Sequence, residues 1–178
     1  EATRLLLASN DVDSIRVADI ADGAGCSTAT IHNHFPNALP DILAAISEDI
    51  IQAAFKQFEK ISKDFSGLEL VRSYFKTVGE HISEQADVAV PSIAISVDLA
   101  SQGSWFDRKI FSDCKELFKT AKETEQINGS HDQLASLTHT FFQGALYSWA
   151  LGSITSEEFL RMSTESVDFA VSSCRGAA

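Results

Sequence analysis

The side chains best suited to chemistry lie close together between positions 27 and 34, on a short predicted helix. Beyond its buried side, this helix presents small or polar side chains: Thr28, Ala29, Thr30, His32, Asn33 and His34. Hydroxyl, amide and imidazole groups donate and accept hydrogen bonds. The major groove of DNA displays matching donors and acceptors on its base edges and admits an α-helix. The pattern therefore predicts a helix that contacts base pairs.

The surrounding sequence contains the elements needed to position such a helix. Residues 17–35 read VADIADGAGCSTATIHNHF, which predicts two short helices joined by a turn. Gly25 suits the turn because a left-handed backbone is favourable for glycine. Ser27 is expected to cap the second helix. Ala21 is small enough for close approach of the two helices, and the expected apolar contacts between them come from Ile20, Ala24, Cys26 and Ile31.

This helix-turn-helix segment resembles the DNA-binding domain of the TetR family of transcriptional regulators, over roughly residues 2–50. The matching stretches are Val17-Ala18-Asp19-Ile20-Ala21, Ala24-Gly25-Cys26-Ser27 and Ala29-Thr30-Ile31-His32-Asn33-His34-Phe35. The resemblance implies that Ile31 is a core residue and that Phe35 packs the domain. The residues that it implies for DNA contact, with the adjoining Arg16 and Ser27 added, are Arg16, Ser27, Thr28, Ala29, Thr30, His32, Asn33 and His34.

Several departures from the family pattern affect DNA binding. Arg16 replaces a capping threonine and is expected near a phosphate, while His32 and Asn33 replace paired tyrosines. The loop at 35–41 is one residue longer and lacks a lysine that normally meets the DNA backbone. Residues 1–50 carry two basic and eight acidic side chains, a net charge of −6, within a chain of net charge −11. Because phosphate contacts supply much of DNA affinity, a second reading stays open: a ligand- or protein-binding module on the same fold with eroded DNA binding.

The whole chain of 178 residues is expected to be all-α, because apolar residues recur at helical spacing and no convincing alternation occurs. We expect a DNA-binding domain at 1–45 and an effector-binding and dimerisation domain at 46–178. A long fourth helix is expected to join the two domains. The nine expected helices are 2–8, 17–24, 27–35, 41–65, 68–85, 91–100, 107–127, 131–151 and 159–174, the last preceded by a helix start at 155–158.

A small-molecule effector site is implied by the same resemblance, in a cavity between the later helices. An apolar lining favours an aromatic or lipophilic effector. The residues expected to line it are Phe75, Val78, His81, Phe111, Cys114, Phe118, His139, Phe142 and Leu146.

The last two helices carry apolar residues on more than one side. On the final helix one stripe contains Phe159, Met162, Phe169 and Ser173, and another contains Leu160, Val167, Val171 and Cys174. A helix with two apolar faces in a small domain indicates a partner subunit. We therefore expect a homodimer through these two helices, as the family resemblance also implies, bound to a palindromic operator whose sites lie about one DNA turn apart.

Other functional classes receive little support from the sequence. The sequence contains no nucleophile–base pair that would suggest an enzyme. His32-Asn33-His34 spells a nuclease signature, but that nuclease fold requires β-strands beside the site, and none is predicted there. The other histidines and the three cysteines lack metal-ligand spacing, so neither metal nor cofactor is expected. No apolar window of about 18 residues predicts a membrane helix, and with no secretion signal at the start of the sequence we expect a cytoplasmic protein.

Overall fold

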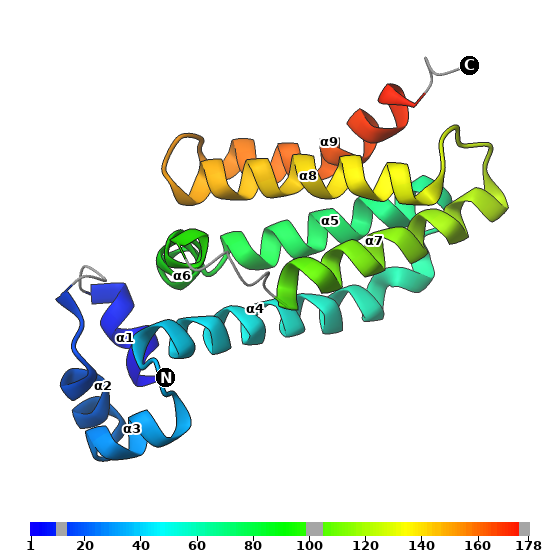
Figure 1. The fold of residues 1–178 in the computed structure, drawn as a ribbon. Coiled ribbons are helices and arrows are strands. Elements are labelled where there is room, and N and C mark those ends of the chain that lie inside the picture. The colour runs from blue at the N-terminus through cyan, green and yellow to red at the C-terminus, as the bar shows by residue number, and fades with distance from the viewer. Residues whose placement is uncertain (10–13, 99–104, 175–178) are drawn as a thin grey trace.

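The computed structural model describes residues 1–9, 14–98 and 105–174, and helices dominate all three ranges (Figure 1). Within these ranges there are nine α-helices and no strand, which confirms the predicted all-α fold. A short 3-10 turn at Ser62–Asp64 follows the fourth helix. The helices are α1 Ala2–Ser9, α2 Val17–Ala24, α3 Thr28–His34, α4 Leu39–Ile61, α5 Gly67–Ser83, α6 Ala86–Asp98, α7 Trp105–Thr124, α8 His131–Ala150 and α9 Ser156–Ser173.

The three short N-terminal helices form a unit at one end of the molecule, and the longer helices form a bundle beside it (Figure 1). α4 leaves this unit and runs along one side of the bundle, while α8 and α9 lie on the opposite side. Both α4 and α1 pack against α6. α3 is therefore joined to the bundle through α4, and the N-terminal unit is also attached to the bundle through α1.

α5 is the central helix of the bundle, because it packs against α4, α7 and α9. The side chains of Tyr74 and Phe75 on this helix are almost fully buried. Phe75 lies against Phe142 of α8 with ring centroids 5.2 Å apart, and Trp149 stacks on Phe159 at 5.0 Å. Burial of such large apolar side chains is the main stabilising contribution to the bundle.

The predicted start of the last helix is confirmed in detail. Thr155 accepts the backbone N–H of Glu158 through its hydroxyl at 3.2 Å, and the Glu158 carboxylate accepts the backbone N–H of Thr155 at 2.8 Å. This reciprocal capping box satisfies two amides that the first turn of a helix leaves without partners.

The predicted start of the sixth helix is wrong. The segment 87–91, expected to be a connector, is helical, and α6 begins at Ala86 rather than Pro91. The backbone N–H groups of Val88 and Ala89 bond to the Gln85 carbonyl at 3.0 and 2.8 Å, so the first turn forms before the proline. Pro91 then removes one backbone hydrogen bond, which the burial of Val88 and Ala89 offsets. The predicted end at Ala100 lies outside the described residues.

α4 begins at Leu39, two residues before the predicted start, with Pro40 in its first turn. The residue before it, Ala38, has φ 55° and ψ −115°, a backbone conformation that a non-glycine residue rarely adopts. Its N–H bonds to the Phe35 carbonyl at 2.8 Å, and its side chain is buried. Ala38 lies in the loop at 35–41 that is one residue longer than the family pattern. Its strained backbone turns the chain from α3 into α4.

Candidate functional site

The α2–α3 segment has the geometry of a helix-turn-helix. Gly25 ends α2 with φ 64°, in the left-handed region that its sequence position predicted. The N–H of Cys26 bonds back to the Ala21 carbonyl at 2.9 Å, and that of Gly25 bonds to the Asp22 carbonyl at 3.1 Å. These two bonds close the end of α2 and fix the direction in which the chain enters α3.

The N-termini of the two helices are capped differently. The Ser27 hydroxyl accepts the Thr30 N–H at 3.1 Å, which confirms the predicted cap of α3. At α2 the Arg16 side chain makes no cap, but the Asp19 carboxylate accepts the Arg16 backbone N–H at 3.0 Å. Asp19 therefore supplies one half of a capping box at α2, and Arg16 lacks the hydroxyl that would supply the other half.

The exposed side of α3 consists of the six side chains singled out from the sequence. Those of Thr28, Ala29, Thr30, His32, Asn33 and His34 are all exposed. Ile31, between them in sequence, is only 7% exposed and packs into the same core as Ile20 and Ala21. α3 is thus held by one buried residue while its polar side chains face outward.

The prediction that Ala24 is a core residue of this unit is wrong. Ala24 is exposed, whereas Ile20 and Ile31 are buried, and Cys26 is half-buried against the core. Ala24 is the last residue of α2, where the chain turns at Gly25 and no neighbouring helix covers it. Phe35, expected to pack the domain, is half-buried against the core.

The electrostatic environment of α3 is acidic. Arg4 and Arg16 are the basic residues among positions 1–50. The Arg4 guanidinium bonds to the Gln85 side chain at 2.8 Å and is half-buried, whereas Arg16 is exposed at the start of α2. Exposed Asp19 and Asp22 on α2 add negative charge within the helix-turn-helix itself.

Six of the nine residues predicted to line an effector cavity lie in the interior of the bundle. These six are buried in the apolar core: Phe75, Val78, Cys114, Phe118, Phe142 and Leu146. Phe111 and His139 are half-buried and meet edge to face with ring centroids 5.6 Å apart. His81, at the last turn of α5, lies with its Nδ1 3.9 Å from the Glu84 carboxylate. Burial raises the pKa of the Cys114 thiol, with a further contribution from Asp113, so this cysteine is an apolar core residue at neutral pH.

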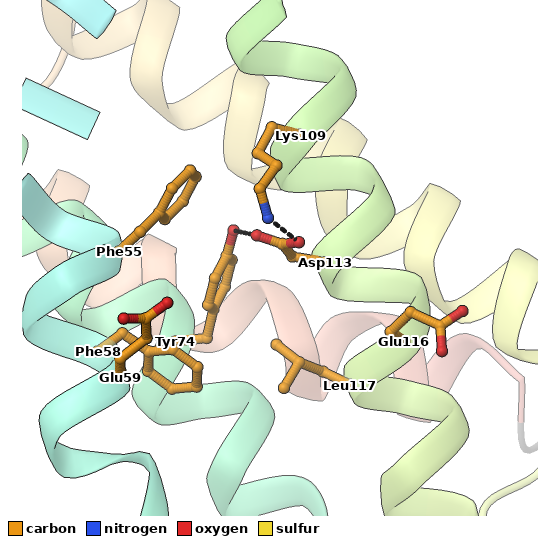
Figure 2. Close-up of a pocket in the computed structure, with 8 residues that line it drawn as sticks. All are labelled: Phe55, Phe58, Glu59, Tyr74, Lys109, Asp113, Glu116 and Leu117. Carbon is orange, nitrogen blue, oxygen red and sulfur yellow. Dashed lines mark hydrogen bonds and ion pairs between the residues drawn. The ribbon is translucent and has the colours of Figure 1, made fainter. Parts of the chain in front are cut away.

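A pocket of about 250 Å³ lies elsewhere, on the side of the bundle where α4 and α7 flank α5 (Figure 2). None of the nine residues predicted for effector binding lines it. Its walls are formed by Phe55, Phe58 and Glu59 of α4, Tyr74 of α5, and Lys109, Asp113, Glu116 and Leu117 of α7.

A small polar network occupies one wall of this pocket. The Tyr74 hydroxyl donates to the Asp113 carboxylate at 3.1 Å, and the Lys109 ammonium forms an ion pair with the same carboxylate. The ammonium also lies 5.0 Å from the centroid of the Phe55 ring. Burial, and secondarily the nearby Asp113 charge, raises the pKa of Tyr74 far above its ordinary value, so its hydroxyl remains a donor.

The sequence offered only weak signals for this pocket. Lys109 and Asp113 are four residues apart on a helix, as paired charges often are. Phe55, Phe58 and Glu59 follow a helical spacing on α4, but core residues do so as well. Tyr74 comes from a third helix, and only the packing of the bundle brings it to the other two.

The outer side of α8 and α9 carries a contact between two aromatic rings. Phe141 and Phe169 lie with ring centroids 4.9 Å apart, although 44% of Phe169 is exposed. The two predicted stripes of α9 are not separated as expected: Phe159 and Val167 are both fully buried, and Phe169 faces outward. The members of the first predicted stripe therefore do not share one environment, because Phe159 is buried and Phe169 is exposed.

The described parts of the chain contain neither a metal-binding cluster nor a membrane-spanning helix. No group of three or more histidine, cysteine, aspartate or glutamate side chains there is arranged to hold a metal ion. No helix in those parts is long and apolar enough to cross a membrane.

Comparison with known proteins gives structural matches and no sequence matches. No family profile and no curated protein matches the sequence. The structure of FadR from Thermus thermophilus, a TetR-family transcriptional repressor in complex with lauroyl-CoA, is 15% identical, with a TM-score of 0.68 over 93% of this chain and 89% of that one. A Rhodococcus sp. protein assigned to the TetR family is 17% identical, with a TM-score of 0.66 over 96% of this chain and 94% of that one.

A transcriptional regulator from Cytophaga hutchinsonii is similar to the same extent, at 14% identity and a TM-score of 0.64 over 97% of this chain and 92% of that one. The matches therefore include the N-terminal unit and the helical bundle together. The chain has the fold of the TetR-family transcriptional regulators.

Proposed function

We propose that this protein is a ligand-responsive transcriptional regulator, a repressor, that binds a palindromic DNA operator as a homodimer. Residues 1–45 form the DNA-binding domain, and residues 46–178 bind an effector and dimerise. α3 enters the major groove with Thr28, Ala29, Thr30, His32, Asn33 and His34 toward the bases. Ser27 and Arg16, at the starts of α3 and α2, lie toward phosphates.

The observation that carries this proposal is the separation of the two sides of α3. Ile31 is buried, and the six other side chains of the helix are exposed. A helix whose exposed side chains are small or hydrogen-bonding can approach base edges closely, because no long side chain holds it away from the groove. The cap of α3 comes from Ser27 and that of α2 from Asp19, so both are made by residues of the N-terminal unit.

The effector is proposed to be a small apolar or aromatic molecule bound in the interior of the bundle, near Phe75, Val78, His81, Phe111, Cys114, Phe118, His139, Phe142 and Leu146. The lauroyl-CoA complex of the Thermus protein shows that this fold accommodates a ligand with an apolar chain. The Thr138 hydroxyl of α8 is fully buried, and the described residues offer it no hydrogen-bond partner. Such a group is unfavourable, so an acceptor on a bound effector would stabilise it.

The proposed regulation is a shift between two populations of the dimer. α4 follows α3 after the short turn at 35–38 and packs against α5 and α6 of the bundle, so a change in its tilt moves α3. An effector releases DNA only if it binds more tightly to the conformation in which the two α3 helices are spaced wrongly for the operator.

The test is a selection from a random DNA library at low salt, with the wild-type protein and the His32→Ala/Asn33→Ala variant in parallel. The proposal expects the wild type to enrich a two-fold-symmetric site whose affinity falls steeply with salt. The variant should enrich nothing while retaining its thermal stability, because both side chains are exposed. Equal enrichment by both proteins would place the DNA contacts elsewhere.

The second candidate is a ligand- or protein-binding module with eroded DNA binding. The acidic surroundings of α3 favour it, because Asp19 and Asp22 are exposed and the neighbouring basic residues are few. Absence of any enriched DNA, even at low salt, would support this candidate and contradict the regulator.

A further inference from the structure

The exposed side of α3 is divided into a middle and two edges, because its side chains lie at different angles from the buried Ile31. Successive residues of an α-helix are rotated by about 100° around its axis. Ala29 and Asn33 are each two positions from Ile31, so they lie almost opposite to it, in the middle of the exposed side. His32 lies at one edge of that side and His34 at the other.

The place of a side chain on this helix determines which part of the DNA it meets. A helix in the major groove has base edges beneath the middle of its outer side and a phosphate backbone along each edge. His32 and His34 are the members of the exposed set nearest to the phosphates, which hold a helix in position without carrying sequence information. Ala29 and Asn33 are the members placed directly over the bases.

Asn33 has the free hydrogen-bonding group that reading a base requires. Its side chain is exposed, and its amide makes no hydrogen bond with any residue that the structure describes. The hydroxyl of Thr30, by contrast, lies 2.9 Å from the Ser27 hydroxyl, within the cap of α3. The side-by-side acceptor and donor of an asparagine amide match N6 and N7 of adenine in the major groove.

Ala29 presents a methyl group one helical turn before Asn33. The two residues are four positions apart, on one face of the helix and about 6 Å apart along its axis. Since base pairs are stacked about 3.4 Å apart, the two side chains can meet neighbouring base pairs. An alanine methyl in the major groove contacts the methyl group of thymine. The middle of α3 therefore fits A·T base pairs rather than G·C base pairs.

We propose that Asn33 is the specificity-determining residue of α3: it binds N6 and N7 of one adenine in each half of the operator, and Ala29 contacts the methyl group of a neighbouring thymine. This readout rests on the proposed function, since it exists only if α3 enters the major groove. The DNA that the protein selects then has A·T base pairs at the centre of each half-site. His34 adds affinity without distinguishing between bases.

The test uses the full chain and the site that it selects from a random DNA library. An adenine should occupy the same position in both halves of that site. Replacing both of these adenines by 7-deazaadenine removes the N7 acceptor without changing base pairing, and should lower the affinity about tenfold in a fluorescence-anisotropy titration. Replacing a neighbouring thymine by uracil removes one methyl group and should lower the affinity about fourfold.

Asn33→Ala and His34→Ala, two substitutions at exposed residues of the same helix, separate reading from affinity. Asn33→Ala should bind the adenine and 7-deazaadenine sites equally, because the side chain that distinguishes them is gone. His34→Ala should bind both sites more weakly by the same factor and keep the tenfold preference. A preference that Asn33→Ala retains, or that His34→Ala loses, would overturn the proposal.

The results also separate this readout from the proposed function. If the wild type enriches no DNA, the regulator and the readout are both contradicted. If it enriches a two-fold-symmetric site that lacks a shared adenine, or that tolerates 7-deazaadenine, operator binding stands and the Asn33 readout alone is wrong.

Discussion

Arg4 of α1 donates a hydrogen bond from its Nη1 to the side-chain carbonyl of Gln85 at 2.8 Å, joining the N-terminal unit to the point where α5 gives way to α6. The backbone carbonyl of Gln85 accepts the first two hydrogen bonds of α6. One residue thus starts a bundle helix and binds the unit that carries α3. In the proposed regulator, this contact is a second mechanical connection beside α4.

Removing this contact should loosen the N-terminal unit. Arg4→Ala and Gln85→Ala should each lower the free energy of unfolding, with a coupling energy of about 1 kcal/mol in the double-mutant cycle. Urea denaturation gives the energies, and amide hydrogen exchange in α1 should become faster in both single variants. Arg16→Ala, which removes an exposed arginine, serves as the control. Additive effects of Arg4→Ala and Gln85→Ala would show that the bond contributes nothing.

The aromatic contact on the outer side of α8 and α9 should lie in the dimer interface. Phe169→Glu places a charge where the proposed partner buries the 44% of Phe169 that is exposed in the single chain. Sedimentation of the wild type should show a dimer and that of Phe169→Glu a folded monomer. Phe65→Glu, at a residue that is 40% exposed beyond α4, is the matched control and should remain dimeric. A dimeric Phe169→Glu protein would place the interface elsewhere.

The contact of α5 with α9 depends on a glycine. A Cβ at Gly79 would lie 2.8 Å from the Ser163 Oγ and 3.1 Å from its Cβ, in a buried position. Gly79→Ala should therefore destabilise the protein by about 1–3 kcal/mol, despite the better helix propensity of alanine. Thermal denaturation measures the change, and adding Ser163→Ala should recover part of it. A more stable Gly79→Ala protein would mean that α9 moves away without loss.

The capping box of α9 makes stability depend on pH in the acid range. The Thr155 backbone N–H, together with its hydroxyl, lowers the pKa of Glu158 below its ordinary value of 4.5. The charged form is favoured by folding, so its stabilisation is present above pH 4.5 and is lost as pH falls through the lowered pKa. Glu158→Gln should be less stable than the wild type at pH 7, with the gap closing below about pH 4. A gap independent of pH would contradict the charged cap.

The N-terminal unit was predictable because its signals are local. Gly25 and Ser27 act on backbone groups within five positions of themselves, and the structure places both as the sequence indicates. Ala24 was misplaced because burial at a helix end depends on neighbours that helical periodicity does not specify. The start of α6 was missed for a related reason, since Pro91 marks a preferred helix start but does not exclude a turn of helix before it.

The α4–α5–α7 pocket was not predictable in this way. Tyr74 and Asp113 are 39 positions apart, and their hydrogen bond forms only because α5 packs against α7. Seven of the nine residues expected to bind an effector are apolar, and six of these fill the core. Apolar periodicity identifies a buried position without distinguishing a packed core from a lined cavity.

Whether a pair of α3 helices enters the major groove is tested most directly by protection of guanine N7 from methylation on the selected DNA site. Two protected clusters about ten base pairs apart, on one face of the duplex, are the predicted result for a dimer. Both clusters should disappear with His32→Ala/Asn33→Ala at concentrations where that variant is folded. A single cluster, or protection that the variant retains, would contradict a dimeric regulator that contacts DNA through α3.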